Sequence, residues 1–202
     1  MQHFTQNDEQ QVILRELAHI KNGNFLDIGA HDGENLSNSR ALALLGWRGT
    51  LVEPNPCLFL NLLGRYQGDS RFTLINSAMS NRSGLANFSY DGSYHQYSSS
   101  LAENAQELFP ETPYIAKYKV NAISPADLAG EVFDFISIDT EGHDLPILRA
   151  FRGMLDQTTL VCIEFNHTDA RGTTNTLEEL NAQGFMEIHR TPENILAKRG
   201  SK

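Results

Sequence analysis

Polar side chains follow five short apolar runs of the sequence, and carboxylates are prominent among them. The runs lead into Asp27-Ile28-Gly29-Ala30-His31-Asp32-Gly33, Glu53-Pro54-Asn55-Pro56, Asn76-Ser77-Ala78-Met79, Asp139-Thr140-Glu141-Gly142-His143-Asp144 and Glu164-Phe165-Asn166-His167. Hydrophobic packing does not explain polar groups at five such ends, because a buried polar group is costly unless it is bonded. Carboxylates, imidazoles and amides bind ligands and move protons, so these segments are the candidate sites of chemistry.

The first segment contains Gly29 and Gly33 with His31 and Asp32 between them. A dinucleotide fingerprint needs a further glycine, in the order Gly-x-Gly-x-x-Gly, to admit a pyrophosphate. An acidic loop also repels a pyrophosphate. S-adenosylmethionine fits better, because it carries an ammonium and a sulfonium. A tight turn alone would account for the two glycines, but Glu53 is also placed to hold ribose hydroxyls.

Candidate catalytic groups lie after residue 138. Asp139 and Glu141 are two carboxylates just past a predicted buried strand, which favours a functional role over two helix caps. His143 is a candidate base, because imidazole titrates near neutral pH, and a surface histidine is its alternative. If a bound S-adenosylmethionine gives its methyl group to a hydroxyl, the reaction needs in-line positioning and a proton acceptor. We therefore expect Asp139, Glu141 and His143 to surround the acceptor hydroxyl.

A metal site is the less favoured alternative. Asp139, Glu164 and Asn166 offer oxygen ligands from two predicted strand ends, which suits Mg²⁺ or Ca²⁺. The arrangement resembles the catechol-type methyltransferases only in outline. The main expectation is that no metal takes part.

The elements that must position these residues alternate between strands and helices. Strand patterns lie at 24–28, 50–53, 72–75, 133–139 and 160–165. Helical patterns lie at 8–21, 34–45, 58–66, 145–154 and 174–183. A closing pair of strands is predicted at 185–189 and 195–198. The alternation predicts an α/β fold with about seven core strands and ligands at the carboxyl ends of its parallel strands.

Residues 84–122 interrupt this alternation. Strands are predicted at 85–90 and 114–120 and a short helix at 101–109. We expect 91–113 to form an acceptor-side loop or lid, because long insertions on compact domains are commonly functional. Its tyrosines and serines suit a sugar or polyol, and a polar surface loop is an equal alternative.

Length and charge exclude several classes of function. The chain has 202 residues, which suits a single domain over 1–202. Its net charge of −9 and the lack of a Lys/Arg cluster argue against nucleic acid or anionic membranes as partners. No apolar run is long enough to span a bilayer, and no secretory signal begins the sequence. Two cysteines without a disulfide pattern favour the cytoplasm, and a homodimer is left open.

The sequence resembles the FkbM-type methyltransferases, a branch of the class I Rossmann-like methyltransferases, over nearly its whole length. The matching pieces are Thr5-Gln6, Phe25-Leu26-Asp27-Ile28-Gly29-Ala30-His31-Asp32-Gly33, Leu36-Ser37-Asn38-Ser39, Gly46-Trp47-Arg48-Gly49, Val52-Glu53-Pro54-Asn55-Pro56, Asn76-Ser77-Ala78-Met79-Ser80, Ile136-Ser137-Ile138-Asp139-Thr140-Glu141-Gly142 and Ile163-Glu164-Phe165-Asn166. The Glu-Pro-Asn-Pro and Asp-x-Glu-Gly pieces are specific in this order. Many members of the family carry a small or acidic residue where His143 stands.

The resemblance implies a mostly parallel seven-stranded sheet with an antiparallel last strand and helices on both faces. It also implies S-adenosylmethionine as cofactor and O-methylation of a hydroxyl on a sugar or small natural product. Asp27, Gly29 and Gly33 would then line the methionine part, Glu53 would hold the ribose, and Ser77 and Ala78 would flank the adenine. The full set of expected cofactor-binding residues is Asp27, Gly29, Ala30, His31, Gly33, Asn38, Glu53, Pro54, Ser77, Ala78 and Asp139. A non-catalytic module that binds S-adenosylmethionine or a nucleoside is the alternative, and a nicotinamide oxidoreductase is disfavoured by the glycine spacing.

Overall fold

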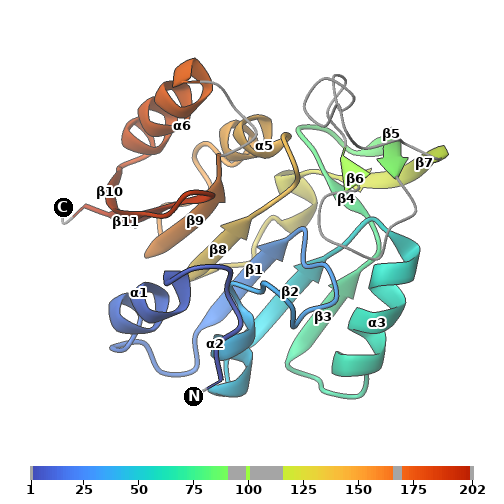
Figure 1. The fold of residues 1–202 in the computed structure, drawn as a ribbon, viewed down its shortest axis with the longest axis horizontal. Helices are drawn as coiled ribbons and strands as arrows, with labels where there is room; N and C mark the ends of the chain where they lie inside the picture. Colours follow the sequence, from blue (N-terminus) through green and yellow to red (C-terminus); the bar gives the residue numbers. More distant parts are fainter. Residues whose placement is uncertain (1, 91–98, 101–115, 166–169, 201–202) are drawn as a thin grey trace.

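A seven-stranded, mostly parallel sheet forms the centre of the computed structural model, which describes residues 2–90, 99–100, 116–165 and 170–200 (Figure 1). Its strands are β1 (Asn24–Ile28), β2 (Arg48–Val52), β3 (Phe72–Ile75), β8 (Phe135–Ile138), β9 (Leu160–Glu164), β10 (Phe185–Arg190) and β11 (Asn194–Arg199). They lie in the order β10-β11-β9-β8-β1-β2-β3. The pairs from β9 to β3 are parallel, and β11 is antiparallel to both of its neighbours. The predicted sheet is thereby confirmed.

Helices cover both faces of this sheet. The helices are α1 (Glu9–Glu16), α2 (Arg40–Leu44), α3 (Pro56–Tyr66), α5 (Asp144–Ala150) and α6 (Ala170–Ala182). Side chains of α1, α2 and α3 share one buried cluster with Phe25, whereas those of α5 and α6 share another with Leu26. Because alternate residues of a strand face opposite sides, β1 contributes to both cores. Among the described helices, none is long and apolar enough to cross a membrane.

A second, smaller sheet lies beyond β3 in the chain. It contains β4 (Ala78–Met79), β5 (Gly84–Tyr90), β6 (Ser99–Ser100) and β7 (Ala116–Ile123), in the order β4-β7-β5-β6, and a 3₁₀ turn (Pro125–Leu128) follows it. The predicted strands at 85–90 and 114–120 are confirmed as the antiparallel pair β5 and β7. The predicted helix at 101–109 and nearly all of the predicted lid at 91–113 lie outside the described residues.

The predicted helix at 34–45 is wrong over its first half, since α2 begins only at Arg40. Leu36 lies in the left-handed region with φ +56°, which a continuous helix does not allow. The Asp32 carboxylate accepts the amides of Glu34 and Asn35, each at 2.9 Å. The Ser37 hydroxyl accepts the amides of Ser39 and Arg40, at 3.3 and 3.0 Å. These side chains replace helical hydrogen bonds and hold 34–39 as a loop. The predicted helix 8–21 is also shorter, ending at Glu16.

The loop after β1 packs tightly against the end of β8. Gly29 has φ +82°, and a Cβ at this position would lie 1.7 Å from the carbonyl oxygen of Asp139. The amides of Gly29 and Ala30 both donate to the Val52 carbonyl, at 2.9 and 3.1 Å. The glycine therefore allows β1, β2 and β8 to end close together.

Replacement of this glycine is expected to destabilise the fold. Gly29→Ala combines a left-handed alanine with backbone overlap, so we expect it to lower the free energy of unfolding by about 2–5 kcal/mol. Urea unfolding followed by circular dichroism measures the change. Gly64→Ala is the matched control, because Gly64 lies exposed in α3 with open space around it and should be neutral or stabilising. Equal behaviour of the two variants would contradict the tight approach.

Candidate active site

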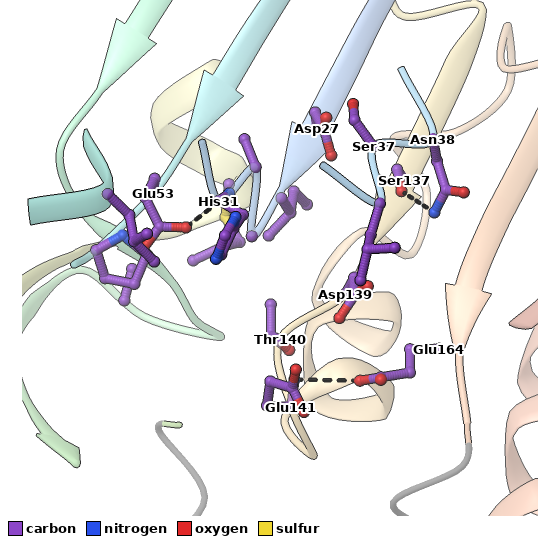
Figure 2. A pocket seen from close by; sticks show the side chains of 18 of the residues that line it. Asp27, His31, Ser37, Asn38, Glu53, Ser137, Asp139, Thr140, Glu141 and Glu164 are labelled. Atoms are coloured by element: carbon purple, nitrogen blue, oxygen red, sulfur yellow. Dashed lines mark hydrogen bonds between the residues drawn. The ribbon is translucent and has the colours of Figure 1, made fainter. Parts of the chain in front are cut away.

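A pocket opens where β1, β2, β8 and β9 end, as expected for a parallel sheet (Figure 2). It encloses about 1150 Å³ of empty space, including the part open to solvent. The residues that line it are Gln6, Asp27, Ile28, Gly29, Ala30, His31, Asn35, Leu36, Ser37, Asn38, Glu53, Pro54, Leu58, Ala78, Met79, Phe88, Ser137, Asp139, Thr140, Glu141 and Glu164.

Most residues expected to bind the cofactor lie in this pocket. Asp27, Gly29, Ala30, His31, Asn38, Glu53, Pro54, Ala78 and Asp139 line it. Gly33 and Ser77 do not. A Cβ on Gly33 would lie 2.6 Å from side-chain atoms of Leu62 and Tyr66, so this glycine serves the packing of α3. A direct cofactor contact stays a prediction for all of these residues, those that line the pocket included.

Glu53 is buried at the end of β2, with a backbone donor on each oxygen. Oε2 accepts the amide of His31 at 2.9 Å, and Oε1 accepts the amide of Asn55 at 2.7 Å. Burial raises the pKa of Glu53 to about 7, against the lowering effect of these two bonds. Each carboxylate oxygen has more than one lone pair, so a diol could still bind to both. His31 reaches its position in the left-handed region, with φ +52°.

Asp27 forms a second buried carboxylate, on β1. Burial raises its pKa to about 6, although the Ser39 hydroxyl donates a hydrogen bond to it. Its register partner on β8 is Ser137, whose hydroxyl accepts a hydrogen bond from the Asn38 side chain at 3.2 Å. Figure 2 shows Asp27, Asn38 and Ser137 on one side of the pocket. Sequence reasoning missed Ser137, although a lone serine inside the apolar run 135–138 is the signal that could have found it.

Three carboxylates gather at the ends of β8 and β9. Asp139, Glu141 and Glu164 each offer an oxygen, and these oxygens lie within 4.8 Å of one another. The Glu141 amide donates to Glu164 Oε2 at 3.2 Å (Figure 2). Burial and the charge of Glu164 hold the pKa of Asp139 well above its ordinary value. Two of the three predicted catalytic residues therefore meet, joined by Glu164.

The turn after β8 separates Glu141 from His143. The Asp144 carboxylate accepts the Thr140 amide at 2.7 Å and the Gly142 amide at 3.1 Å, which closes the turn. Glu141, with φ +57°, lines the pocket. His143 lines a separate hollow, where its Nε2 lies 3.4 Å from the Ser80 hydroxyl. The structure does not bring His143 to the carboxylates, and its role as a base stays a prediction.

The cluster could hold a divalent cation or face a cationic ligand. Asp139 and Glu164 belong to the metal alternative raised from the sequence, and Glu141 supplies a third oxygen. Asn166, the third ligand of that alternative, lies outside the described residues. The described lining includes no lysine or arginine, and its one imidazole is that of His31.

Solved structures of methyltransferases share this fold. A precorrin-6y C5,15-methyltransferase from Geobacter metallireducens is 16% identical, with a TM-score of 0.54 over 99% of this chain and 92% of that one. The putative methyltransferase yhhF from Escherichia coli is 12% identical, with a TM-score of 0.52 over 97% and 88%. A ribosomal protein L11 methylase from Lactobacillus delbrueckii is 11% identical, with a TM-score of 0.53 over 95% and 78%. The fold is therefore that of the class I methyltransferases.

The sequence identifies the family within this fold class. Residues 27–189 match the Methyltransferase FkbM domain, and the chain belongs to this methyltransferase family. Membership supports S-adenosylmethionine as its cofactor. Among curated proteins, no sequence matches the chain at a significant level.

The buried carboxylates predict how stability depends on pH. Because the folded pKa of Glu53 is about 7 and its ordinary value is 4.5, the unfolded chain releases this proton at lower pH. The free energy of unfolding should therefore fall as pH rises from about 4.5 to 7, by roughly 1–3 kcal/mol for this group. Urea unfolding at a series of pH values measures it.

Glu53→Gln should make this pH dependence shallower. The variant loses a hydrogen-bond acceptor at every pH, which lowers its stability throughout. The readout is therefore the change of the free energy of unfolding with pH and not its value at one pH. Glu131→Gln, at an exposed position, should leave the slope unchanged. If the free energy of unfolding depends on pH equally in Glu53→Gln and in the wild type, the raised pKa of Glu53 is contradicted.

Proposed function

We propose that the chain is an S-adenosylmethionine-dependent O-methyltransferase that acts on a hydroxyl of a sugar or small natural product. The observation that carries the proposal is the acidic pocket at the carboxyl ends of β1, β2, β8 and β9. Family membership supports methyl transfer, and the choice of oxygen and of acceptor rests on the chemistry of the lining residues.

The lining fits a cationic donor. Its carboxylates are Asp27, Glu53, Asp139, Glu141 and Glu164. Burial and mutual repulsion raise the pKa of Asp139, and a bound positive charge would relieve that repulsion. When bound, S-adenosylmethionine supplies a methyl group activated by a positively charged sulfur. Glu53 would hold the ribose hydroxyls, while Pro54 and Ala78 offer apolar surface for the adenine.

The carboxylate cluster suits the proton that an attacking hydroxyl must release. An ionised carboxylate with a raised pKa is a stronger base than an ordinary one, and the positive charge of a bound donor would favour the ionised form of Asp139. Glu164 lies against Asp139, and Glu141 lies on the same side of the pocket (Figure 2). We assign proton uptake to this cluster and orientation of the acceptor to Glu141.

A non-catalytic module that binds the donor is the second candidate. A donor-binding pocket alone does not require three adjoining carboxylates beside the expected sulfonium, so the cluster favours the enzyme. A saccharide is one of the two acceptor classes in the proposal, and the question of a homodimer stays open.

Donor binding should depend on Glu53. Isothermal calorimetry with S-adenosylhomocysteine should show that Glu53→Ala weakens binding by about 1–3 kcal/mol, because charge-assisted hydrogen bonds are lost. Glu131→Ala, at an exposed position, should bind like the wild type. Unchanged affinity in Glu53→Ala would remove the ribose assignment, and tighter binding of NADH than of S-adenosylmethionine would remove the methyltransferase assignment.

Turnover should depend on Glu141 without equal loss of donor affinity. Glu141→Gln should lower kcat by roughly 10²–10⁴-fold, as for a group that acts on the acceptor proton or its position. Donor affinity should stay within a few-fold, because Glu53 is untouched. Transfer of a radiolabelled methyl group to a panel of sugars and polyols measures the rate.

Two further experiments test His143 as a base and the metal alternative. His143→Ala tests the remaining sequence prediction, because a comparable loss would place His143 in the reaction and full turnover would exclude it. Inhibition by EDTA that Mg²⁺ reverses would favour the metal alternative over a carboxylate base. Full turnover in Glu141→Gln would contradict the assignment of this residue.

A further inference from the structure

The N-terminal segment of residues 2–8, which we call the N-terminal strap, contributes a wall of the pocket. It is the dark blue segment that leads to α1 in Figure 1. Gln6 lines the pocket, and its neighbours Phe4 and Thr5 are buried. The strap precedes residues 27–189, the range of the FkbM domain match, although Thr5-Gln6 is among the pieces that resemble the family. Gln6 was not among the residues expected to bind the cofactor.

A buried carboxylate fixes the strap to the far end of the chain. Glu9 is fully buried, and its Oε1 accepts the Thr191 hydroxyl at 2.8 Å and the Asn194 side-chain amide at 3.1 Å. Its Oε2 accepts the backbone amide of Asn7 at 2.8 Å, directly after Gln6. Burial raises the pKa of Glu9, but these hydrogen bonds outweigh it and hold the pKa below its ordinary value. Glu9 is therefore ionised at neutral pH.

The same hydrogen bonds connect the strap to the carboxylate cluster. Asn194 begins β11 and is the register partner of Glu164 at the end of β9. The Asn7 side chain also donates to Glu193, whose carbonyl accepts the amide of Phe165 at 2.9 Å. Glu9 therefore links Asn194, the strand partner of Glu164, to Asn7, the residue that follows Gln6. This link lies on the β9 side of the sheet, three strands from Glu53 on β2.

Gln6 has a chemical character that the carboxylates lack. The amino-acid end of S-adenosylmethionine bears a carboxylate, which Asp and Glu side chains repel and only donors can bind. The side-chain amide of Gln6 carries two N–H donors. If Glu53 holds the ribose of S-adenosylmethionine, the amino-acid end of this ligand would point toward β9. On that side the N-terminal strap supplies the side-chain amide of Gln6 as a donor.

We propose that Gln6 binds the carboxylate at the amino-acid end of the methyl donor, and that Glu9 is the positioning residue that presents it. This inference rests on the proposed function, since it assumes that the pocket takes S-adenosylmethionine.

Calorimetry with two ligands tests the contact. S-adenosylhomocysteine contains the amino-acid end, and 5′-methylthioadenosine lacks it. Gln6→Ala should weaken S-adenosylhomocysteine about tenfold to hundredfold, the loss for one hydrogen bond to a charged group. It should leave 5′-methylthioadenosine within twofold. Equal losses for both ligands, or no loss for either, would overturn the assignment.

A double-variant cycle tests the role of Glu9. Glu9→Gln should weaken S-adenosylhomocysteine about fivefold or more while sparing 5′-methylthioadenosine. If Glu9 acts through Gln6, the variant with both changes should bind no more weakly than Gln6→Ala alone. Additive losses would overturn the positioning role. Thr191→Val, which removes one bond to Glu9, provides a milder second variant should Glu9→Gln fail to fold.

Hydrogen exchange supplies a readout independent of affinity. Amides of residues 2–8 should exchange faster in Glu9→Gln, and S-adenosylhomocysteine should slow them in the wild type. Glu179→Gln is the matched control, because Glu179 is a buried carboxylate bound to Arg152 and is not among the residues lining the pocket. It should leave the affinity and the strap unchanged. Failure of the wild type to bind either ligand would refute the proposed function, whereas normal binding with unaffected variants would refute this inference alone.

Discussion

The removal of carboxylates from water at one edge of the sheet is the constraint on which the rest of the structure depends. Each buried negative charge must be bonded, neutralised by a proton or faced by a cation. The fold supplies two backbone amides to Glu53 and a serine hydroxyl to Asp27. Asp139 instead faces Glu164, and its pKa rises. A positive charge bound beside Asp139 would favour its ionised form.

This constraint also explains the local geometry of the loops. The chain passes through left-handed conformations at His31 and Glu141, which carry side chains at the edge of the pocket. Such conformations are costly for residues other than glycine, so tertiary contacts must hold them. The amide of His31 is held by Glu53, and that of Glu141 by Glu164. The carboxylates therefore shape the loops that surround them as well as the ligand site.

Local sequence patterns predicted the sheet and most of the pocket, but not the contacts that bring distant segments together. Strand ends could be located because apolar runs stop at polar residues, and parallel strands present those ends at one edge. The first half of the helix predicted at 34–45 was wrong because side chains of Asp32 and Ser37 took the place of helical bonds. The direction of His143 depends on how Asp144 closes its turn. No local pattern could reveal the contact of Glu9 with Asn194, since it joins opposite ends of the chain.

That last contact shows that the folding unit is wider than the segment by which the family is recognised. Residues 27–189 include neither Glu9 nor its partners Thr191 and Asn194. They also omit β11, the strand that lies between β9 and β10. A chain trimmed to the recognised segment would therefore lose the antiparallel strand that pairs with both neighbours. The two ends of the sequence, although far apart along the chain, complete a single wall of the molecule together.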